Sequence, residues 1–135
     1  MKNYIIIALT ILILGCKNDT PRLIDFPIDK IIEYNELFKQ NEYEYYVYIF
    51  SNSCIHCNEI KNEIIDFDNN TTISMYFIQF SPKINVNKDI ESTIGCNNIE
   101  DFSILGTPSL ILIKDKLVVI NLGGKKAILN HLKNH

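Results

Sequence analysis

The sequence has no cluster of basic residues, and this limits the partners that the protein can have. Its 135 residues include 13 lysines and arginines against 16 acidic residues, and the formal net charge is −3. Proteins that bind nucleic acid concentrate basic residues in a patch or a stripe. We therefore expect no nucleic acid among the partners.

Internal repeats and low-complexity blocks are also absent, and hydrophobic residues make up 47% of the chain, an ordinary share for a globular protein. The polar stretch KNDTPR, residues 17–22, lacks periodicity and is typical of a short tether. No second linker follows it. We therefore expect a leader at residues 1–15, a tether at 16–28 and one folded domain at 29–135.

The N-terminal stretch MKNYIIIALTILILGC is too short for a membrane-spanning helix. Its apolar run, residues 4–14, falls well short of the roughly 20 residues that a span needs. Lys2, the apolar run and Gly15 before Cys16 are together typical of an export signal. ILGC resembles the lipobox of bacterial lipoproteins, which implies cleavage before Cys16 and a lipid on that residue, holding the domain at a membrane surface. The alternatives are an uncleaved anchor, or a secretory signal that leaves Cys16 as a free thiol.

Helices and strands are expected to alternate along the domain. The sequence predicts helices at residues 29–40, 54–67, 98–104 and 125–134. Dense aromatic and β-branched runs predict strands at residues 42–52, 71–80, 109–114 and 117–123, the last two forming a hairpin around Asp115. This order predicts an α/β fold whose central mixed sheet contains a parallel pair and a hairpin, with helices on both faces.

Two cysteines, Cys54 and Cys57, lie where the first strand should end and a helix should begin. A helix N-terminus stabilises an anion, so we expect Cys54 to be the thiolate nucleophile. Cys57 shares the apolar face of that helix and is the expected resolving thiol, a pairing that thiol–disulfide exchange requires. His56, between them, would stabilise the thiolate and favour an oxidant; alternatively it is an exposed loop residue of no consequence.

Two stretches, VYIFSNSCIHC at residues 47–57 and LGTPSLILIKDKLVVINLGG at 105–124, resemble the thioredoxin superfamily. The resemblance implies a thioredoxin-like fold over residues 29–135. It also implies a cis peptide bond before Pro108, with Thr107 and Pro108 presenting backbone groups to an extended substrate and keeping metals off the cysteines. The Cys-x-His-Cys loop and the Thr-Pro pair are similar to those of exported disulfide oxidases and isomerases.

Two positions depart from that family. Ser53 occupies the place of a tryptophan before the first cysteine, and the chain contains no tryptophan. Tyr48 occupies the place of a buried aspartate that serves proton transfer, and a phenol is a poor base at neutral pH. The group that takes the proton from Cys57 is therefore left open.

Other readings of the cysteines and histidines are weaker. Haem attachment requires histidine after the second cysteine, but residue 58 is asparagine. The pair with His56 lacks a fourth zinc ligand, and His131 with His135 is more often a solvated helix face than a metal site. A purely structural disulfide would close a very small ring and restrain little. Cys96 is expected to be a small buried residue, or else a third redox cysteine.

These features predict a thiol–disulfide oxidoreductase outside the cytoplasm, lipid-anchored to a bacterial membrane on the periplasmic side or the cell surface. Its expected partners are exported proteins or peptides and a redox partner that recharges the cysteine pair, and no cofactor or metal is expected. The alternative is a thioredoxin-fold binding lipoprotein without turnover. The direction of electron flow is not set by the sequence, although His56 favours oxidation or isomerisation.

Overall fold

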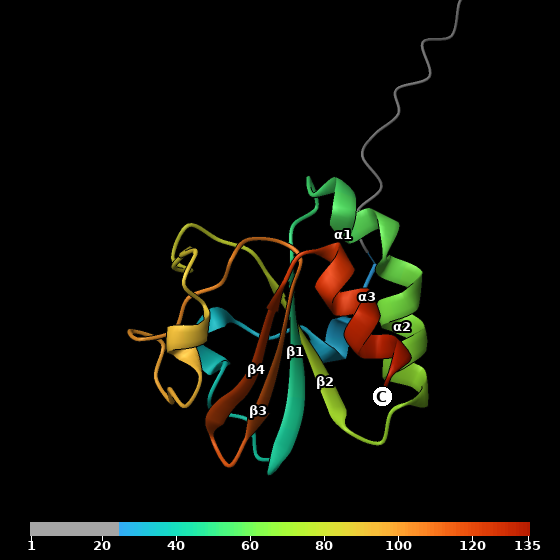
Figure 1. Cartoon of the computed structure of the whole chain (residues 1–135). Helices are drawn as coiled ribbons and strands as arrows, with labels where there is room; N and C mark the ends of the chain where they lie inside the picture. Colours follow the sequence, from blue (N-terminus) through green and yellow to red (C-terminus); the bar gives the residue numbers. More distant parts are fainter. Residues whose placement is uncertain (1–24) are drawn as a thin grey trace, which may run out of the picture.

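A computed structural model describes residues 25–135, which form one mixed four-stranded sheet with its covering helices and loops (Figure 1). The strands are β1 (Glu44–Phe50), β2 (Ser74–Gln79), β3 (Ser109–Lys114) and β4 (Leu117–Gly123). The α-helices are α1 (Ile55–Glu59), α2 (Lys61–Asn70) and α3 (Lys125–Lys133). Three 3₁₀ helices complete the set: η1 (Ile28–Lys30), η2 (Tyr34–Glu36) and η3 (Glu91–Thr93).

The sheet has the predicted mixed topology, with strand order β2-β1-β3-β4. β1 and β2 are parallel and are joined through α1 and α2, whereas β3 is antiparallel to both β1 and β4. Asp115 and Lys116 connect β3 to β4 with φ values of 51° and 64°. Positive φ at both loop residues matches the twist of a tight hairpin, so the predicted turn at Asp115 is confirmed.

The sheet is buried on both faces, which explains why the sequences of its central strands are unbroken apolar runs. Tyr46, Tyr48 and Phe50 of β1 face one core cluster, and the alternating residues Tyr45, Val47 and Ile49 face a second. α2 and α3 cover the first face (Figure 1). The second face is covered by η2 and by the long segment 80–108, which contains η3.

The helix predicted at residues 29–40 is wrong, because this segment forms only η1 and η2. Ile31 makes a bridge to Phe77, and the Ile32 amide donates a hydrogen bond to the Phe77 carbonyl at 2.9 Å. Backbone groups that a helix would use are thus bonded to the edge of β2. The segment is also fastened to α2, because the Lys30 ammonium donates to both carboxylate oxygens of buried Asp68, at 2.7 and 2.8 Å.

The short helix predicted at residues 98–104 is also wrong. The Asn98 side chain accepts a hydrogen bond from the Asp101 amide at 2.9 Å, and its amide donates to the Asp101 carboxylate. Such side-chain bonds compete with the helical backbone pattern. Ile104 then makes a bridge to Val86, so the segment runs as a bent loop.

The N-terminal boundary of the packed domain lies slightly before residue 29. Phe26 is buried and stacks on Phe77 with ring centroids 4.4 Å apart, so the end of the expected tether is part of the core. The expected signal and the expected lipid site at Cys16 lie outside the described residues. Between residues 25 and 135, no helix is both long and apolar enough to cross a bilayer.

Candidate active site

Cys54 is placed by the end of β1 and the start of α1. After Phe50 the chain turns, and the Cys54 amide donates to the Ser51 carbonyl at 3.1 Å. Cys54 has extended backbone angles and is the N-cap of α1, where its sulfur accepts a hydrogen bond from the Cys57 amide at 3.1 Å. That amide would otherwise be unpaired at a helix start, so it is available to stabilise negative charge on the Cys54 sulfur.

Cys54 and Cys57 form a disulfide, with their Cα atoms 5.2 Å apart. Cys54 is half-buried, whereas Cys57 is 0% exposed and belongs to the core beneath α1. One sulfur can therefore be reached by an incoming thiol, and the other is sheltered. This difference in access is the one that the spacing of the two cysteines predicted.

A loop before β3 lies against the accessible sulfur. The Thr107–Pro108 peptide bond is cis, as the resemblance implied. The Thr107 carbonyl oxygen lies 3.4 Å from the Cys54 sulfur, and the Ser109 hydroxyl donates to the Gly106 carbonyl at 2.6 Å. The structure thus brings together two segments that are far apart in the sequence.

Leu105, the residue before this loop, fixes its position against β4. A Cβ atom built on Gly123 would lie 2.4 Å from the Leu105 Cβ, so the two segments touch where only glycine fits. The Gly124 amide also donates to the Pro108 carbonyl at 2.8 Å. The end of β4 and the start of α3 therefore support the cis-proline loop.

His56 lies on the exposed side of α1 and is turned towards α3. Its Nδ1 is 2.9 Å from a carboxylate oxygen of Glu59, and the same oxygen accepts a hydrogen bond from the Lys125 ammonium at 2.7 Å. The hydrogen bond with His56, followed by that with Lys125, lowers the pKa of Glu59. Within residues 25–135, no hydrogen bond joins the His56 ring to either sulfur.

Sequence reasoning did not single out this Glu59 bridge. Residues three apart on a helix are neighbours, so the pairing of His56 with Glu59 could have been read from the sequence. Lys125 lies 66 positions beyond Glu59, and no local pattern marks it.

Tyr48 lies in the core cluster that also contains Cys57. It is 0% exposed, and within the described part of the chain its hydroxyl has no hydrogen-bond partner. Burial raises the pKa of this phenol well above its ordinary value. Tyr48 therefore stays neutral and does not supply the carboxylate base that is missing from the sequence.

The remaining candidate residues lie away from the cysteine pair. Cys96 is half-buried, and its thiol is free. Its backbone carbonyl accepts a hydrogen bond from the Val118 amide of β4, and burial raises the pKa of its thiol. The His131 Nε2 shares a hydrogen bond with the Tyr46 hydroxyl at 2.9 Å, and the His131 and His135 rings lie 4.4 Å apart. In residues 25–135, no group of three potential metal-ligating side chains comes together.

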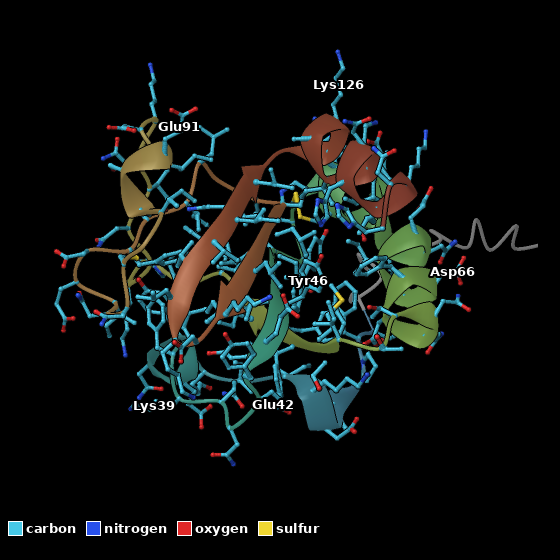
Figure 2. All side chains as sticks on the ribbon, turned by 60° about the horizontal axis from the view of Figure 1, so that its bottom comes forward. Lys39, Glu42, Tyr46, Asp66, Glu91 and Lys126 are labelled. Carbon is cyan, nitrogen blue, oxygen red and sulfur yellow. A yellow bond between two sulfur atoms is a disulfide. The ribbon has the colours of Figure 1, made fainter. Side chains whose placement is uncertain are left out.

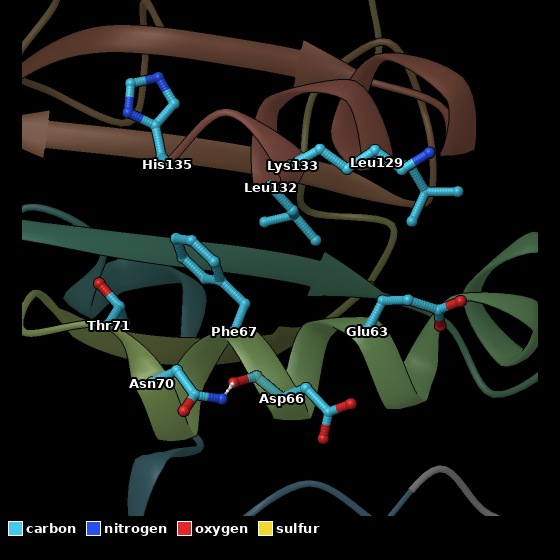
Figure 3. Close-up of a pocket in the computed structure, with 9 residues that line it drawn as sticks. All are labelled: Glu63, Asp66, Phe67, Asn70, Thr71, Leu129, Leu132, Lys133 and His135. Atoms are coloured by element: carbon cyan, nitrogen blue, oxygen red, sulfur yellow. Dashed lines mark hydrogen bonds between the residues drawn. The ribbon is translucent and has the colours of Figure 1, made fainter.

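A hollow of about 370 Å³ lies between α2 and α3 (Figure 3). The side chains of Phe67, Leu129 and Leu132 point into it, and Glu63 and Lys133 lie at its margin. Neither cysteine lines this hollow, and neither does the cis-proline loop. It is therefore not the centre of the candidate site.

Comparisons with known proteins identify the fold. No family model and no curated protein matches the chain. Among solved structures, thioredoxin f2 of Chlamydomonas reinhardtii is 11% identical with a TM-score of 0.52, over 78% of this chain and 94% of that one. Reduced Schistosoma mansoni thioredoxin pre-protein is 17% identical with a TM-score of 0.52, over 78% and 97%. Oxidised thioredoxin of Plasmodium falciparum is 21% identical with a TM-score of 0.50, over 78% and 95%.

These identities are low, and the likeness lies in the arrangement of the sheet and its helices. The predicted fold class is confirmed. The chain has the thioredoxin-like α/β fold, and its Cys54–Cys57 disulfide forms a close pair consistent with a thioredoxin-like active site.

Proposed function

We propose that the protein is a thiol–disulfide oxidoreductase that acts outside the cytoplasm through Cys54 and Cys57. One observation carries the proposal: an accessible N-cap sulfur is paired with a fully buried one and lies beside a cis-proline loop. A structural crosslink would not require this difference in access, and a ring this small restrains little of the unfolded chain.

As an oxidant, the protein would exchange its disulfide for two substrate thiols. A substrate thiolate attacks the Cys54 sulfur, the Cys54–Cys57 bond breaks, and Cys57 leaves with the electron pair and takes up a proton. A second substrate thiolate then attacks the substrate sulfur of the mixed disulfide and releases Cys54. Two electrons and two protons pass to the protein, and the substrate gains one disulfide.

As a reductant, the protein would run the same steps in reverse. The Cys54 thiolate, stabilised by the Cys57 amide at the start of α1, attacks a substrate disulfide. The substrate S–S bond breaks, one substrate sulfur leaves as a thiolate and takes up a proton, and the other stays on Cys54 as a mixed disulfide. Cys57 loses its proton and attacks Cys54 in the mixed disulfide, which closes the protein disulfide and releases the substrate thiol. The reduction potential of the couple, relative to that of the redox partner, decides which direction prevails.

The expected location and partners are part of the proposal. The export signal and the lipid on Cys16 would hold the domain at the outer side of a bacterial membrane, on the periplasmic side or at the cell surface. Exported proteins or peptides would be the substrates, extended along Thr107 and Pro108. A membrane or soluble redox partner would recharge the cysteine pair.

His56 has a more limited part in this proposal than the sequence alone implied. A protonated ring would favour the Cys54 thiolate at short range, but Glu59 accepts a hydrogen bond from the ring and would offset that positive charge. We therefore propose that His56 tunes the potential only weakly while the Glu59 bridge is intact.

A second candidate function is a thioredoxin-fold binding lipoprotein without turnover. Tyr48 favours it, because a buried neutral phenol replaces the acid that would accept a proton from Cys57. Such a protein would present its cis-proline loop to a partner and keep its disulfide intact.

Reduction of insulin by dithiothreitol, and refolding of a scrambled disulfide protein, separate the two functions. Full-length protein in a non-ionic detergent should accelerate at least one of these reactions, and Cys54→Ser should lose the whole acceleration. Cys96→Ser removes a thiol outside the pair and should retain it. If Cys54→Ser performs as well as the unmodified chain, the enzyme proposal is wrong.

A further inference from the structure

A second hollow, of about 1130 Å³, has His56, the residue between the two cysteines, in its lining. It runs from His56, in the cysteine loop, along the start of α3, and Gly124 forms part of its wall. The Gly124 amide donates a hydrogen bond to the Pro108 carbonyl. The hollow therefore adjoins the two segments beside the Cys54 sulfur, the cysteine loop and the cis-proline loop. A substrate bound at that sulfur would have its neighbouring residues in or near the hollow.

The lining of this hollow is basic, although the chain carries a net charge of −3. Lys125, Lys126 and Lys133 line it together with His56, and none of its lining residues is acidic. Lys125 is offset by Glu59, as described above. Within residues 25–135, neither Lys126 nor Lys133 takes part in an ion pair, and both are exposed.

The Glu59 bridge involves only two of the basic residues of the hollow, His56 and Lys125. By accepting from both His56 and Lys125, Glu59 ties α1 to the start of α3 and holds the imidazole as one wall of the hollow. The free positive charges of Lys126 and Lys133 are then left to interact with a ligand. Figure 2 shows Lys126 projecting from α3 into solvent.

We propose that this basic hollow selects substrate segments that carry aspartate or glutamate beside the reactive cysteine. The inference rests on the proposed thiol–disulfide exchange and adds the substrate class to it. Exposed lysines can be solvated without any role, but clustered charges beside a reactive group raise the encounter rate of an oppositely charged partner. This effect is strongest at low ionic strength, because salt at about 0.1 M screens charges over roughly 10 Å.

Three short peptides that differ only in charge test the proposal. Each carries one central cysteine in a disulfide with thionitrobenzoate, flanked by glutamates, by glutamines or by lysines. The reduced full-length protein in non-ionic detergent releases the coloured thiol, and the second-order rate constant is measured at low and high salt. We expect the glutamate peptide to react roughly tenfold faster than the glutamine peptide at low salt, and the lysine peptide to react more slowly.

Charge-reversal variants identify the lysines responsible. In Lys126→Glu/Lys133→Glu, the ratio of the glutamate rate to the glutamine rate should fall to one or below. The control Lys39→Glu/Lys88→Glu has the same net charge change at exposed lysines that do not line the hollow, and it should keep the ratio. Figure 2 shows Lys39 at the opposite end of the molecule from Lys126.

The outcomes separate this inference from the proposed function. If no peptide reacts, thiol–disulfide exchange is wrong and the inference fails with it. If the glutamine peptide reacts but the glutamate peptide has no advantage at low salt, exchange stands and the basic hollow is not a substrate site. An equal fall in the ratio of the glutamate rate to the glutamine rate in both charge-reversal variants also overturns the proposal. The proposal is overturned as well if the protein shows no peptide preference but binds anionic phospholipid vesicles through Lys126 and Lys133.

Discussion

Both faces of the sheet are buried, but they are covered by different structures. α2 and α3 pack on the face that includes Tyr46 and Tyr48, whereas the opposite face is covered by η2 and the irregular segment 80–108. The candidate site takes one half from each cover. The α-helical side supplies the cysteine pair, and the loop side supplies Thr107 and Pro108. The comparison shows that an irregular cover can position a site as closely as a helical one.

The largest expected effect tests whether the two covers are equally well packed. Ile64 of α2 and Ile104 of the loop segment are both 0% exposed, one on each face. We expect Ile64→Ala and Ile104→Ala each to lower the free energy of unfolding by about 2–5 kcal/mol, because each leaves a cavity in a closed core. Urea unfolding followed by circular dichroism measures both values. A loss at Ile104 far below that at Ile64 would show that the loop cover is loosely held.

A smaller effect is expected where the loop cover touches β4. In Gly123→Ala the new methyl group would overlap the Leu105 Cβ, which can move only with its backbone. The overlap should lower the free energy of unfolding by about 1–3 kcal/mol. It should also shift the loop that places the Thr107 carbonyl beside Cys54, and so slow thiol exchange. Both quantities are measured, by urea unfolding and by insulin reduction.

A compensating change makes this prediction specific. Leu105→Gly removes the atom that the new methyl group would overlap. Gly123→Ala in that background should then cost little relative to Leu105→Gly alone. An equal cost in both backgrounds would mean that the close approach of Leu105 and Gly123 does not position the loop.

The smallest expected effect lies on the α-helical face, at His131. Burial lowers the pKa of His131, and the nearby His135 ring lowers it further. The His131 ring shares a hydrogen bond with the Tyr46 hydroxyl. The unfolded state therefore binds a proton more readily than the folded state. The contribution of neutral His131 to stability is complete above the pKa of this histidine in the unfolded chain, near 6.5. It is lost as the pH falls through the lower pKa that His131 has in the folded protein.

Unfolding measured between pH 7 and pH 5 should show this dependence. The loss should be under about 1 kcal/mol, because the ring is only partly buried and water screens its charge. His131→Gln can keep a bond to Tyr46 and should flatten the pH dependence. A steeper loss of stability at low pH in His131→Gln than in the unmodified chain would contradict this role.

The sequence predicted the sheet well and its irregular cover poorly. Strands such as residues 44–50 and the hairpin at Asp115 are encoded by apolar runs and a tight turn, which are local signals. The helix expected at residues 29–40 does not form, because the Ile32 amide donates a hydrogen bond to β2. No local sequence pattern reveals this contact. Tyr34 and Leu37 of this segment are buried, but Ile31 is 41% exposed, so apolar spacing identified only part of the buried face and none of the backbone pairing.

The candidate site divides in the same way. Cys54, Cys57 and the Thr107–Pro108 bond lie as the motifs implied, because each belongs to a motif that is contiguous in the sequence. The orientation of His56 was not predictable from its place between the cysteines. The orientation of the His56 ring depends on Glu59, which also accepts a hydrogen bond from Lys125, a residue far away in the sequence.

The most direct test of the central claim is to trap the mixed disulfide with variants in which one cysteine of the pair is replaced by serine. Reduced Cys57→Ser should react with a peptide disulfide and stop at an adduct that mass spectrometry locates on Cys54. Cys54→Ser should form little adduct on Cys57, because this remaining sulfur of the pair is fully buried. An adduct that forms on Cys57 as readily as on Cys54, or on neither, would contradict the assignment of Cys54 as the attacking sulfur.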